Sequence, residues 1–458
     1  MNYDEFIVEK LSSVPATGIE DWDSAPQSLF PHQQALVRWA VRRGRAAIFA
    51  DTGLGKSRMQ LAWADAVAKY TNQPVLILAP LAVAPQTVQE GRELGIEVAH
   101  CRSGDQAQGE RIVITNYDRL HLFNPAVFGG IVLDESSCIK HHNTRTLQML
   151  LDAFKHTPFK LCATATPAPN DWTELGTHAE FLGVCSRVEM LSEFFTHDGG
   201  DTSVWRLKGH ARHVFWRWVS QWGALVRKPS DLGFDGAMYE LPPLHLHEHT
   251  VSTEMPLNGM LFAAEAQTLS ERRDARKLSV ADRVAECAAI VNADQQLWVV
   301  WCDLNAEGDA LTAAIDGAVQ IAGADDVETK ERRLADFASG KIRVLVSKPS
   351  ICGFGLNWQH AARMAFVGVT DSFESYYQAV RRCWRFGQKR PVHVHIFASS
   401  AEGAVVANLK RKERDALAMA ESLGAETRDA VMQAVTGSTR QSNAHNAVNR
   451  VIIPSFLG

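Results

Sequence analysis

Short apolar runs alternate with longer helical patterns along both halves of the chain. In the first half the runs lie at residues 46–50, 75–79, 112–115, 131–133 and 160–163, and a helical pattern at 58–70 follows the first of them. In the second half they lie at residues 297–301, 318–321, 344–346, 364–367 and 392–396. Strands that are apolar throughout and separated by helices are typical of parallel sheets covered on both faces. The pattern therefore predicts an α/β fold built on mostly parallel sheets flanked by helices.

A pair of prolines separates the two halves. Pro242 and Pro243 stiffen the chain and stop any helix that reaches them. We therefore predict a first lobe at residues 1–240, a second lobe at 241–424 and a partly flexible C-terminal tail at 425–458. The tail is polar at 436–449 and apolar at 451–457, and this apolar end docks either on the body of the protein or on a protein partner.

Composition excludes several classes of protein. The 458 residues are 46% hydrophobic and 22% charged, which is typical of a globular chain and not of a disordered, collagen-like or coiled-coil one. The net charge of −5 excludes a uniformly basic nucleic-acid binder but leaves room for a local basic groove. The eight cysteines form no C-x-x-C pair, and no apolar stretch approaches the roughly 20 residues that span a bilayer. With an acidic N-terminus that lacks a signal segment, these features predict a cytoplasmic protein without membrane contact.

Residues 50–57 (ADTGLGKS) carry the first candidate chemistry. They follow a predicted strand and open a predicted helix, which is the context in which a Gly-Lys-Ser sequence binds phosphate. Gly53 and Gly55 let backbone N–H groups turn towards phosphate oxygens, and the dipole of the helix N-terminus favours an anion. Lys56 is expected to reach the β and γ phosphates of ATP, and Ser57 to ligate Mg²⁺. The alternative is a glycine-rich turn with an incidental lysine.

Asp134 and Glu135 stand at the end of another predicted strand. Doubly wound sheets bind ligands at the carboxyl ends of their strands, so this pair is expected at the same edge as the phosphate loop. Asp134 is expected to hold Mg²⁺, and Glu135 to orient or deprotonate the attacking water. Alone, the two carboxylates could equally be a solvated pair that opens a loop; the upstream phosphate loop favours the catalytic interpretation.

Arginines gather in residues 376–388, for which we predict a helix. Gln378, Arg381, Arg382 and Arg385 follow one another at i, i+3, i+4 and i+7, so a helix would place them on one face. Such a face needs either solvent or an anion. In an ATPase built of two sheets it could supply arginine fingers, which neutralise charge developing on the γ-phosphate.

The segment at residues 202–230 combines basic and aromatic side chains without any Asp or Glu. Its apolar positions Phe215, Trp218, Trp222 and Leu225 have the spacing of a buried helix face. The opposite face would carry Arg212 and Arg217, which could meet DNA phosphates. A purely structural helix is the alternative. A lesser feature is the alternation of His245, His247 and His249, for which a solvated strand is favoured over a metal site.

Taken together, these motifs resemble those of superfamily-two helicases, and among them the Swi/Snf-type DNA translocases. Residues 50–57 resemble motif I of the family, residues 134–140 (DESSCIK) motif II and residues 378–388 (QAVRRCWRFGQ) motif VI. Further segments resemble the adenine-sensing Q motif at 29–33, motif Ia at 79–86, the Thr-Tyr segment at 114–118, motif III at 163–170 and motif V at 353–357. Two positions depart from the pattern, since Ser137 stands where many relatives have His or Gln, and Arg381 adds a second arginine beside Arg382.

The resemblance implies two RecA-like lobes with ATP and Mg²⁺ in the cleft between them. The first lobe would supply Lys56, Asp134 and Glu135 to catalysis, and the second Arg382 and Arg385. The expected nucleotide-binding residues are Gln33, Thr52, Gly53, Gly55, Lys56, Ser57, Gly355 and Gln378, and Ser57 and Asp134 would hold the metal. The expected nucleic-acid contacts are Thr115, Asn357, Arg212 and Arg217.

The implied function is ATP hydrolysis that DNA stimulates and that drives translocation along DNA, most simply duplex DNA gripped by its backbone without sequence preference. Alternatives are a strand-separating or branch-migrating helicase, and a nucleotide-gated clamp with little turnover. Compact versions of this kind resemble those of bacteriophages, so we expect the cytoplasm of a bacterial or phage-infected cell.

Overall fold

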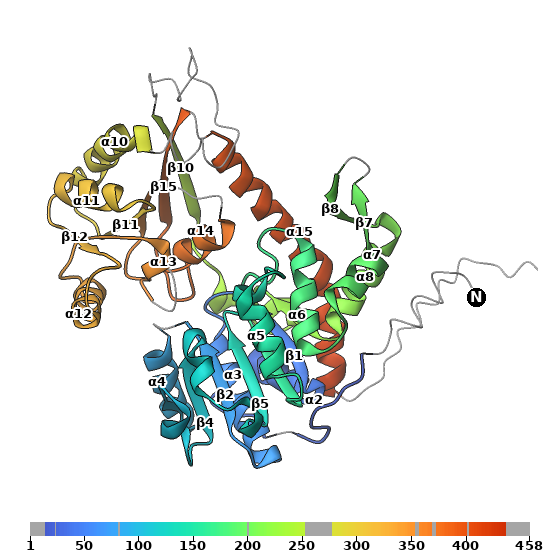
Figure 1. The fold of residues 1–458 in the computed structure, drawn as a ribbon. Helices are drawn as coiled ribbons and strands as arrows, with labels where there is room; N and C mark the ends of the chain where they lie inside the picture. The colour runs from blue at the N-terminus through green and yellow to red at the C-terminus, as the bar shows by residue number, and fades with distance from the viewer. Residues whose placement is uncertain are drawn as a thin grey trace, which may run out of the picture.

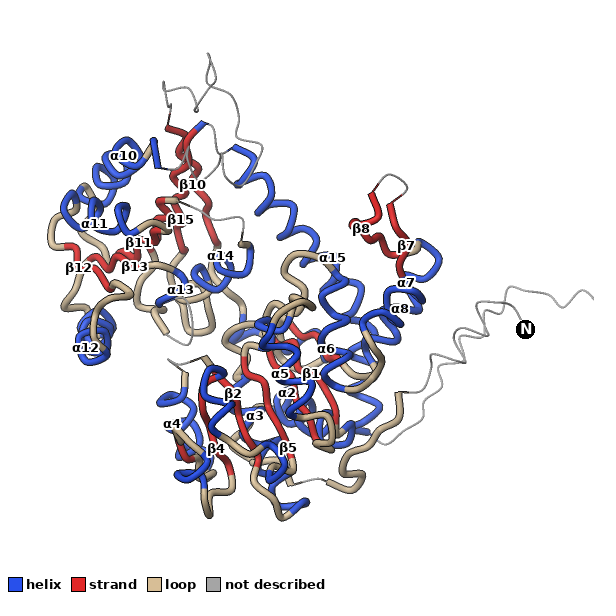
Figure 2. The backbone as a smooth tube through the Cα atoms, viewed as in Figure 1, coloured by secondary structure: helices blue, strands red, loops and turns tan. Residues whose placement is uncertain are grey.

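The computed structural model describes residues 14–22, 24–80, 83–198, 201–251, 277–352, 357–368, 372–400 and 403–436. They form two α/β lobes, each built on its own parallel sheet, with the first lobe below the second in Figure 1. The strands of each sheet lie side by side between helices (Figure 2). The predicted fold class is therefore confirmed.

The sheet of the first lobe has seven strands in the order β3-β4-β2-β5-β6-β1-β9, all paired in parallel. In chain order these are β1 (Arg45–Ala50), β2 (Val75–Ala79), β3 (Ala99–His100), β4 (Ile112–Asn116), β5 (Gly130–Asp134), β6 (Phe159–Ala163) and β9 (Gly223–Val226). Successive residues of β1 enter different cores, since Phe49 packs in one hydrophobic cluster and Ile48 in the other. The sheet is thus buried on both faces, which explains why its strands are apolar throughout.

Helices cover this sheet, and a short antiparallel hairpin projects from it. The helices are α2 (Pro31–Arg43), α3 (Lys56–Thr71), α4 (Ala84–Leu94), α5 (Arg145–Ala153), α6 (Leu175–Leu182), α7 (Arg187–Phe194) and α8 (Arg212–Ser220). The hairpin pairs β7 (Phe195–Asp198) with β8 (Asp201–Leu207). It stands beside α7 and α8 at the edge of the lobe (Figure 1).

The sheet of the second lobe has six strands in the order β10-β15-β14-β11-β13-β12, again all parallel. They are β10 (Leu244–Val251), β11 (Trp298–Cys302), β12 (Ala318–Ile321), β13 (Val344–Ser347), β14 (Arg363–Val367) and β15 (Val392–Ser399). The helices are α10 (Val280–Asn292), α11 (Asn305–Ala314), α12 (Val327–Ala338), α13 (Pro349–Cys352), α14 (Phe373–Val380) and α15 (Gly403–Thr436). None of the described helices of either lobe combines the length and apolarity of a membrane span.

The long helix α15 leaves the second lobe and packs on the first. It starts shortly after β15, and its Met419 and Leu423 are buried in a hydrophobic cluster of the first lobe. The hydroxyl of Thr427 accepts a hydrogen bond from the backbone N–H of Leu225 at 3.1 Å, which satisfies one donor on the free edge of β9. Figure 1 shows α15 crossing from one lobe to the other. This helix therefore contacts both lobes and links them.

The lobe boundaries and the tail remain predictions from sequence. The predicted tail begins inside α15, because this helix continues from residue 424 to Thr436. Its polar and apolar parts at 437–458 lie outside the described residues, so the protein-partner prediction has no structural counterpart.

The predicted strand with alternating histidines is confirmed as β10. Its side chains meet those of β15, with His247 Nε2 2.9 Å from His393 Nδ1 and His249 Nε2 3.0 Å from His395 Nδ1. The rings stack along the parallel pair, and burial lowers the pKa of His395 to about 4. No cluster of His, Cys, Asp or Glu suited to a metal occurs among the described residues.

Candidate active site

A cavity of about 420 Å³ lies where the second lobe faces the carboxyl edge of the first sheet. It brings together residues from almost the whole length of the chain. Its lining contains Phe30, Gln33, Thr52, Gly53, Gly55, Lys56, Ser57, Arg58, Asp134, Glu135, Tyr239, Asn357, Arg382, Arg385 and Phe386. All five predicted catalytic residues are in this set. Of the predicted nucleotide-binding residues, Gln378 lies beside the cavity, whereas Gly355 lies outside the described residues.

The phosphate loop joins β1 to α3 along the wall of this cavity. Gly53 and Gly55 have φ of +89° and +79°, a backbone conformation that other residues avoid. α3 begins at Lys56, whose Nζ donates to the carbonyl oxygen of Ala50 at 2.9 Å. Gln33 braces the loop from α2 by donating from Nε2 to the carbonyl oxygen of Leu54 at 2.9 Å. The loop is thus held open around the helix N-terminus, where an anion is favoured.

The two carboxylates at the end of β5 are held in different ways. Asp134 accepts a hydrogen bond from Gln60 Nε2 at 2.6 Å. Glu135 has φ of +52°, which is costly for a residue with a side chain and is found chiefly at functional sites. Its Oε2 accepts from Thr164 Oγ1 and from Gln378 Nε2, each at 3.3 Å. One contact comes from each lobe, so Glu135 is oriented from both sides of the cleft.

Burial dominates the electrostatics of this site. It lowers the pKa of Lys56, and burial together with the charge of Glu135 raises the pKa of Asp134 to about 7. Burial also lowers the pKa values of Arg382 and Arg385 to about 10, with a further contribution from neighbouring arginines. The two arginines therefore remain charged at neutral pH. A cluster of desolvated cations facing a carboxylate pair suits a polyanionic ligand with a divalent cation.

The predicted helix over residues 376–388 is wrong after Val380. α14 ends there, and the N–H groups of Arg382 and Cys383 bond to carbonyls three residues back instead of four. Two contacts compete with a longer helix for the carbonyl oxygens of Arg382 and Cys383. The N–H of Trp358 donates to the carbonyl of Arg382 at 2.9 Å, and the Gln388 side chain donates to the carbonyl of Cys383 at 3.2 Å. The arginines therefore do not share one face.

Because the chain turns here, the side chains of neighbouring arginines point in different directions. Arg382 and Arg385 line the cavity, and Arg382 donates from Nη2 to Gln378 Oε1 at 3.1 Å. Because Gln378 also donates to Glu135, a hydrogen-bonded chain links Arg382 to the Glu135 carboxylate. Arg381 points instead to the phosphate loop, where its Nη2 lies 2.7 Å from Asp51 Oδ2.

Aromatic side chains at one end of the cavity were not predicted from the sequence. Tyr239 packs against Phe386 of the second lobe with 4.6 Å between ring centroids, and against His32 at 5.3 Å. Tyr239 lies in a short turn before the prolines and belongs to no motif. Gln60 was also missed, although it stands one helical turn after Lys56 on the same face of α3, which could have identified it.

The predicted nucleic-acid residues are not brought to one surface. Thr115 is buried at the end of β4, and Asn357 lines the cavity. Arg212 and Arg217 are exposed on α8, where Arg212 donates to Ser422 Oγ of α15 at 3.2 Å. The aromatic residues of this segment are buried as expected, but α8 ends at Ser220 and Leu225 lies on β9.

His178 is expected to make the stability of the protein depend on pH. Its imidazole is buried, with Nε2 3.1 Å from Ser136 Oγ, and burial lowers its pKa to about 4. Between the unfolded value of 6.5 and about 4, the unfolded chain binds one more proton at this residue, so stability falls as the pH falls. His178→Gln should reduce the slope of the unfolding free energy against pH by about 1.4 kcal/mol per unit in this window.

Denaturant titrations at several pH values measure that slope. His156→Gln is the matched control, because His156 is exposed. Equal slopes for wild type and His178→Gln would contradict the prediction.

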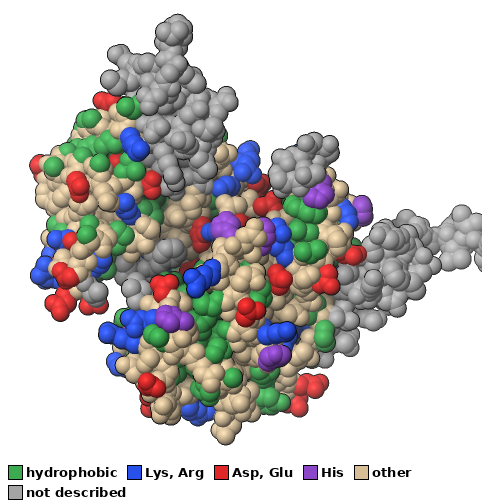
Figure 3. Space-filling model, in the orientation of Figure 1, with side chains coloured by type: hydrophobic (Ala, Val, Ile, Leu, Met, Phe, Trp, Pro, Cys, Tyr) green, Lys and Arg blue, Asp and Glu red, His purple; other side chains and the backbone are tan. Residues whose placement is uncertain are grey.

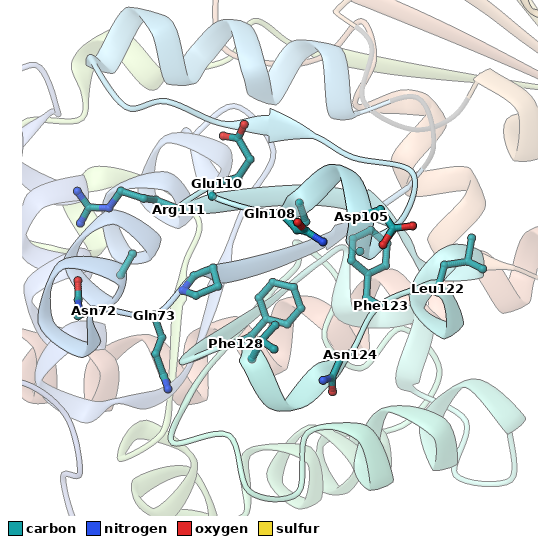
Figure 4. A pocket seen from close by; sticks show the side chains of 16 residues that line it. Asn72, Gln73, Asp105, Gln108, Glu110, Arg111, Leu122, Phe123, Asn124 and Phe128 are labelled. Carbon is teal, nitrogen blue, oxygen red and sulfur yellow. The ribbon is translucent and has the colours of Figure 1, made fainter.

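A larger hollow of the first lobe lies at the opposite edge of the sheet. It has a volume of about 830 Å³ and is lined by Pro74, Arg111, Phe123 and Phe128, next to the amino ends of β2, β4 and β5 (Figure 4). Its charged lining residues are Asp105, Glu110 and Arg111. This hollow offers no group of cations for a triphosphate, so size alone does not identify the site.

Comparison with known proteins gives two family matches. Residues 32–221 match the SNF2-related domain, and residues 304–387 match the helicase conserved C-terminal domain. The two matched ranges contain the phosphate loop, the carboxylate pair and the arginine turn.

Individual relatives are more distant. Protein p41 of Acyrthosiphon pisum secondary endosymbiont phage 1 is 24% identical over 455 residues, which cover 84% of this chain and 96% of that protein. The Homo sapiens ATP-dependent DNA helicase Q4 is 39% identical over 71 residues, which are 15% of this chain and 6% of that protein. Among solved structures, the Sulfolobus solfataricus SWI2/SNF2 ATPase core in complex with dsDNA matches 88% of this chain and 94% of its own, at 18% identity and a TM-score of 0.42.

Proposed function

Because the chain belongs to the Swi/Snf-type superfamily-two helicases and is an ATP hydrolase of that class, we propose that it is a DNA-stimulated motor that translocates along duplex DNA. The observation that carries the proposal is the nucleotide cavity, to which both lobes contribute lining residues. It is lined by the phosphate loop and carboxylate pair of the first lobe and by two arginines of the second. Hydrolysis in this cavity would require both lobes. A motor driven by lobe movement needs such a dependence.

The first lobe would bind the nucleotide. The loop amides and Lys56 would hold the phosphates, and Gln33, with Tyr239 and Phe386 nearby, would contact the base. Ser57 and Asp134 offer a hydroxyl and a carboxylate, which suit Mg²⁺. When bound, that ion would neutralise phosphate charge.

Hydrolysis would follow from residues that converge on the γ-phosphate position. Glu135 would orient a water and accept its proton on the carboxylate, held by Thr164 and Gln378. Arg382 and Arg385 would neutralise the charge that develops on the transferred group. Because the arginines come from the other lobe, catalysis would need the lobes together and product release would let them separate.

DNA would bind across both lobes, outside the nucleotide cavity. Lys, Arg and His side chains lie among Asp and Glu side chains along the border between the lobes on the face drawn in Figure 3. Binding of the DNA backbone by such cations would weaken steeply with salt. The phage relative supports a place in the cytoplasm of a bacterial or phage-infected cell.

ATP turnover with duplex, single-stranded and forked DNA and with RNA tests the proposal. Stimulation by duplex DNA, together with displacement of a third strand from a triplex, is the result we expect. Unwinding of a fork would favour the alternative of a strand-separating helicase. Binding of DNA without stimulated turnover would identify a clamp and refute the motor.

Charge reversal on α8 is expected to weaken DNA stimulation. Arg217 is exposed and Arg212 contacts α15, so Arg217→Glu is the cleaner change. It should raise the DNA concentration for half-maximal ATPase stimulation by roughly tenfold, and reduce the slope of log affinity against log salt by about 1, as the loss of one phosphate contact does.

Lys341→Glu is the matched control, since Lys341 is exposed on the second lobe and pairs only with Asp336 among the ion pairs described. ATPase activity without DNA should be unchanged in both variants. A DNA titration of Arg217→Glu that overlays the wild type would remove α8 from the DNA interface.

A further inference from the structure

Arg381 of the second lobe reaches across the cleft to the phosphate loop. Its Nη2 lies 2.7 Å from Asp51 Oδ2 and donates to the carbonyl oxygen of Thr52 at 3.1 Å, while its Nε donates to the hydroxyl of Thr52. The neighbouring Arg382 and Arg385 line the nucleotide cavity instead. One arginine therefore contacts the loop that would hold phosphate, and the other two face the space that phosphate would fill.

Tyr377 completes the contact from one helical turn earlier. Its hydroxyl donates to Asp51 Oδ1 at 2.5 Å, and the same oxygen accepts from the backbone N–H of Thr52 at 2.6 Å. The side chain of Arg381 is 5% exposed and that of Asp51 12%, so little water competes for these groups. Charge-assisted bonds from a planar guanidinium fix geometry as well as energy. The first turn of the phosphate loop is thus held from the second lobe.

The loop and the arginine turn also touch through their backbones. A Cβ atom built on Gly53 would lie 3.0 Å from Phe386 Cβ and 3.2 Å from Phe386 N, so only glycine fits there without displacement. Behind the loop lies a second, more apolar cavity of about 580 Å³, whose lining includes Asp51, Tyr377 and Arg381. Asp51, Tyr377 and Arg381 thus line the rear cavity and not the nucleotide cavity, whereas Thr52 lines both.

We propose that Arg381 and Tyr377 are positioning residues for ATP, which hold Asp51 and Thr52 so that the phosphate loop keeps its binding shape while the lobes are together. Neither side chain lines the nucleotide cavity, so both act through the loop and neither is an arginine finger. Movement of the lobes then changes the affinity of the first lobe for nucleotide. The inference rests on the proposed function.

Another contact between the lobes provides a comparison. Lys140 of the first lobe forms an ion pair with Glu374 of α14, both largely buried. Glu374 touches neither the phosphate loop nor the nucleotide cavity. Loss of this pair weakens the contact between the lobes and leaves the loop contacts intact.

Steady-state ATPase kinetics with saturating duplex DNA test the proposal. Arg381→Met and Asp51→Asn should each raise the KM for ATP about tenfold, since a buried hydrogen-bonded charge contributes roughly 1.5–3 kcal/mol, while kcat changes by less than about threefold. The double variant should match the single ones, because both remove the same contact. Arg381→Lys should restore part of the affinity, Tyr377→Phe should raise KM about threefold, and Glu374→Gln should leave KM at the wild-type value.

Three results would overturn the inference. These are an unchanged KM in Arg381→Met, a roughly hundredfold rise in the double variant that shows independent effects, and a rise in Glu374→Gln equal to that in Arg381→Met. Thermal unfolding of each variant identifies any that fail to fold, and the milder Arg381→Lys and Tyr377→Phe then carry the test. A wild-type protein without ATPase activity would instead refute the proposed function.

Discussion

Replacement of Glu135 by Gln should lower kcat for ATP hydrolysis by about 10³-fold and leave ATP bound. General-base catalysis contributes roughly 10²–10⁴ in rate, and an amide cannot accept the proton of the attacking water. The side chains have the same size, and the amide oxygen can still accept the hydrogen bonds from Thr164 and Gln378. Substitution also removes the negative charge beside Asp134, which together with burial raises the pKa of that carboxyl to about 7. Metal binding at Asp134 should therefore not be weakened.

Lys56→Ala provides a contrast to Glu135→Gln, because it should affect ATP binding as well as hydrolysis. Lys56 lies in the phosphate loop, so its loss should reduce both nucleotide binding and hydrolysis. Equilibrium binding of labelled ATP and single-turnover hydrolysis measure the two effects. Glu135→Gln that hydrolyses ATP at the wild-type rate would refute the assigned role, and Glu135→Gln that loses ATP binding would place the carboxylate among the binding residues.

Short apolar runs in the sequence predicted most strands of both sheets, because strands buried on both faces are apolar throughout. The apolar runs at 75–79 and 318–321 match β2 and β12 residue for residue, and the others differ by a few residues at their ends. Short strands such as β3 and β9 were missed. β9 has four residues, and its outer edge is satisfied by Thr427, about 200 residues later in the chain. No local pattern contains that information.

The candidate site was predictable where chemistry and chain geometry coincide. A phosphate loop needs glycines, a lysine and a helix in a fixed order. The sequence of residues 50–57 has this order and was therefore sufficient to predict the loop. The arginine segment was harder, because its helical spacing was real but its helix ends at Val380. The backbone N–H of Trp358 bonds to the carbonyl oxygen of Arg382, and the Gln388 side chain bonds to that of Cys383. A longer helix would have used both carbonyl oxygens. Periodicity gives no sign of such competition.

The different directions of the three arginines follow from that same irregular turn. On a regular helix Arg381, Arg382 and Arg385 would have met the same ligand. In the structure one binds the phosphate loop, one joins Gln378 and Glu135, and one faces the cavity. Residue type predicted that an anion would be bound here, whereas only the tertiary structure separates the roles.

Arg385→Ala should produce the other large effect, a loss in kcat of about 10³-fold or more at saturating ATP and DNA. Arginines that stabilise the transferring phosphoryl group contribute roughly 10³–10⁵ in rate. Burial lowers the pKa of Arg385 to about 10, so the guanidinium stays charged at neutral pH, and its charge is poorly screened by water. Arg385→Lys should recover little of the loss, because an ammonium cannot present the same planar set of donors. Arg332→Ala on α12, where the side chain is exposed, is the matched control.

A double-variant comparison distinguishes Arg385 from Arg382. Arg382 is joined through Gln378 to Glu135, so Arg382→Ala should disturb both charge stabilisation and the position of the carboxylate. In the Glu135→Gln background, Arg382→Ala should lower the hydrolysis rate by a much smaller factor than in the wild type. The reason is that the function of the carboxylate, which Arg382→Ala disturbs, is already lost. The charge of Glu135 acts on Arg382, whereas that of Glu90 acts on Arg385, so Arg385→Ala should keep most of its effect in the Glu135→Gln background. Pre-steady-state hydrolysis rates of the wild type, the three single variants and the two double variants decide between these outcomes. Equal coupling of the two arginines to Glu135 would show that they act as one unit.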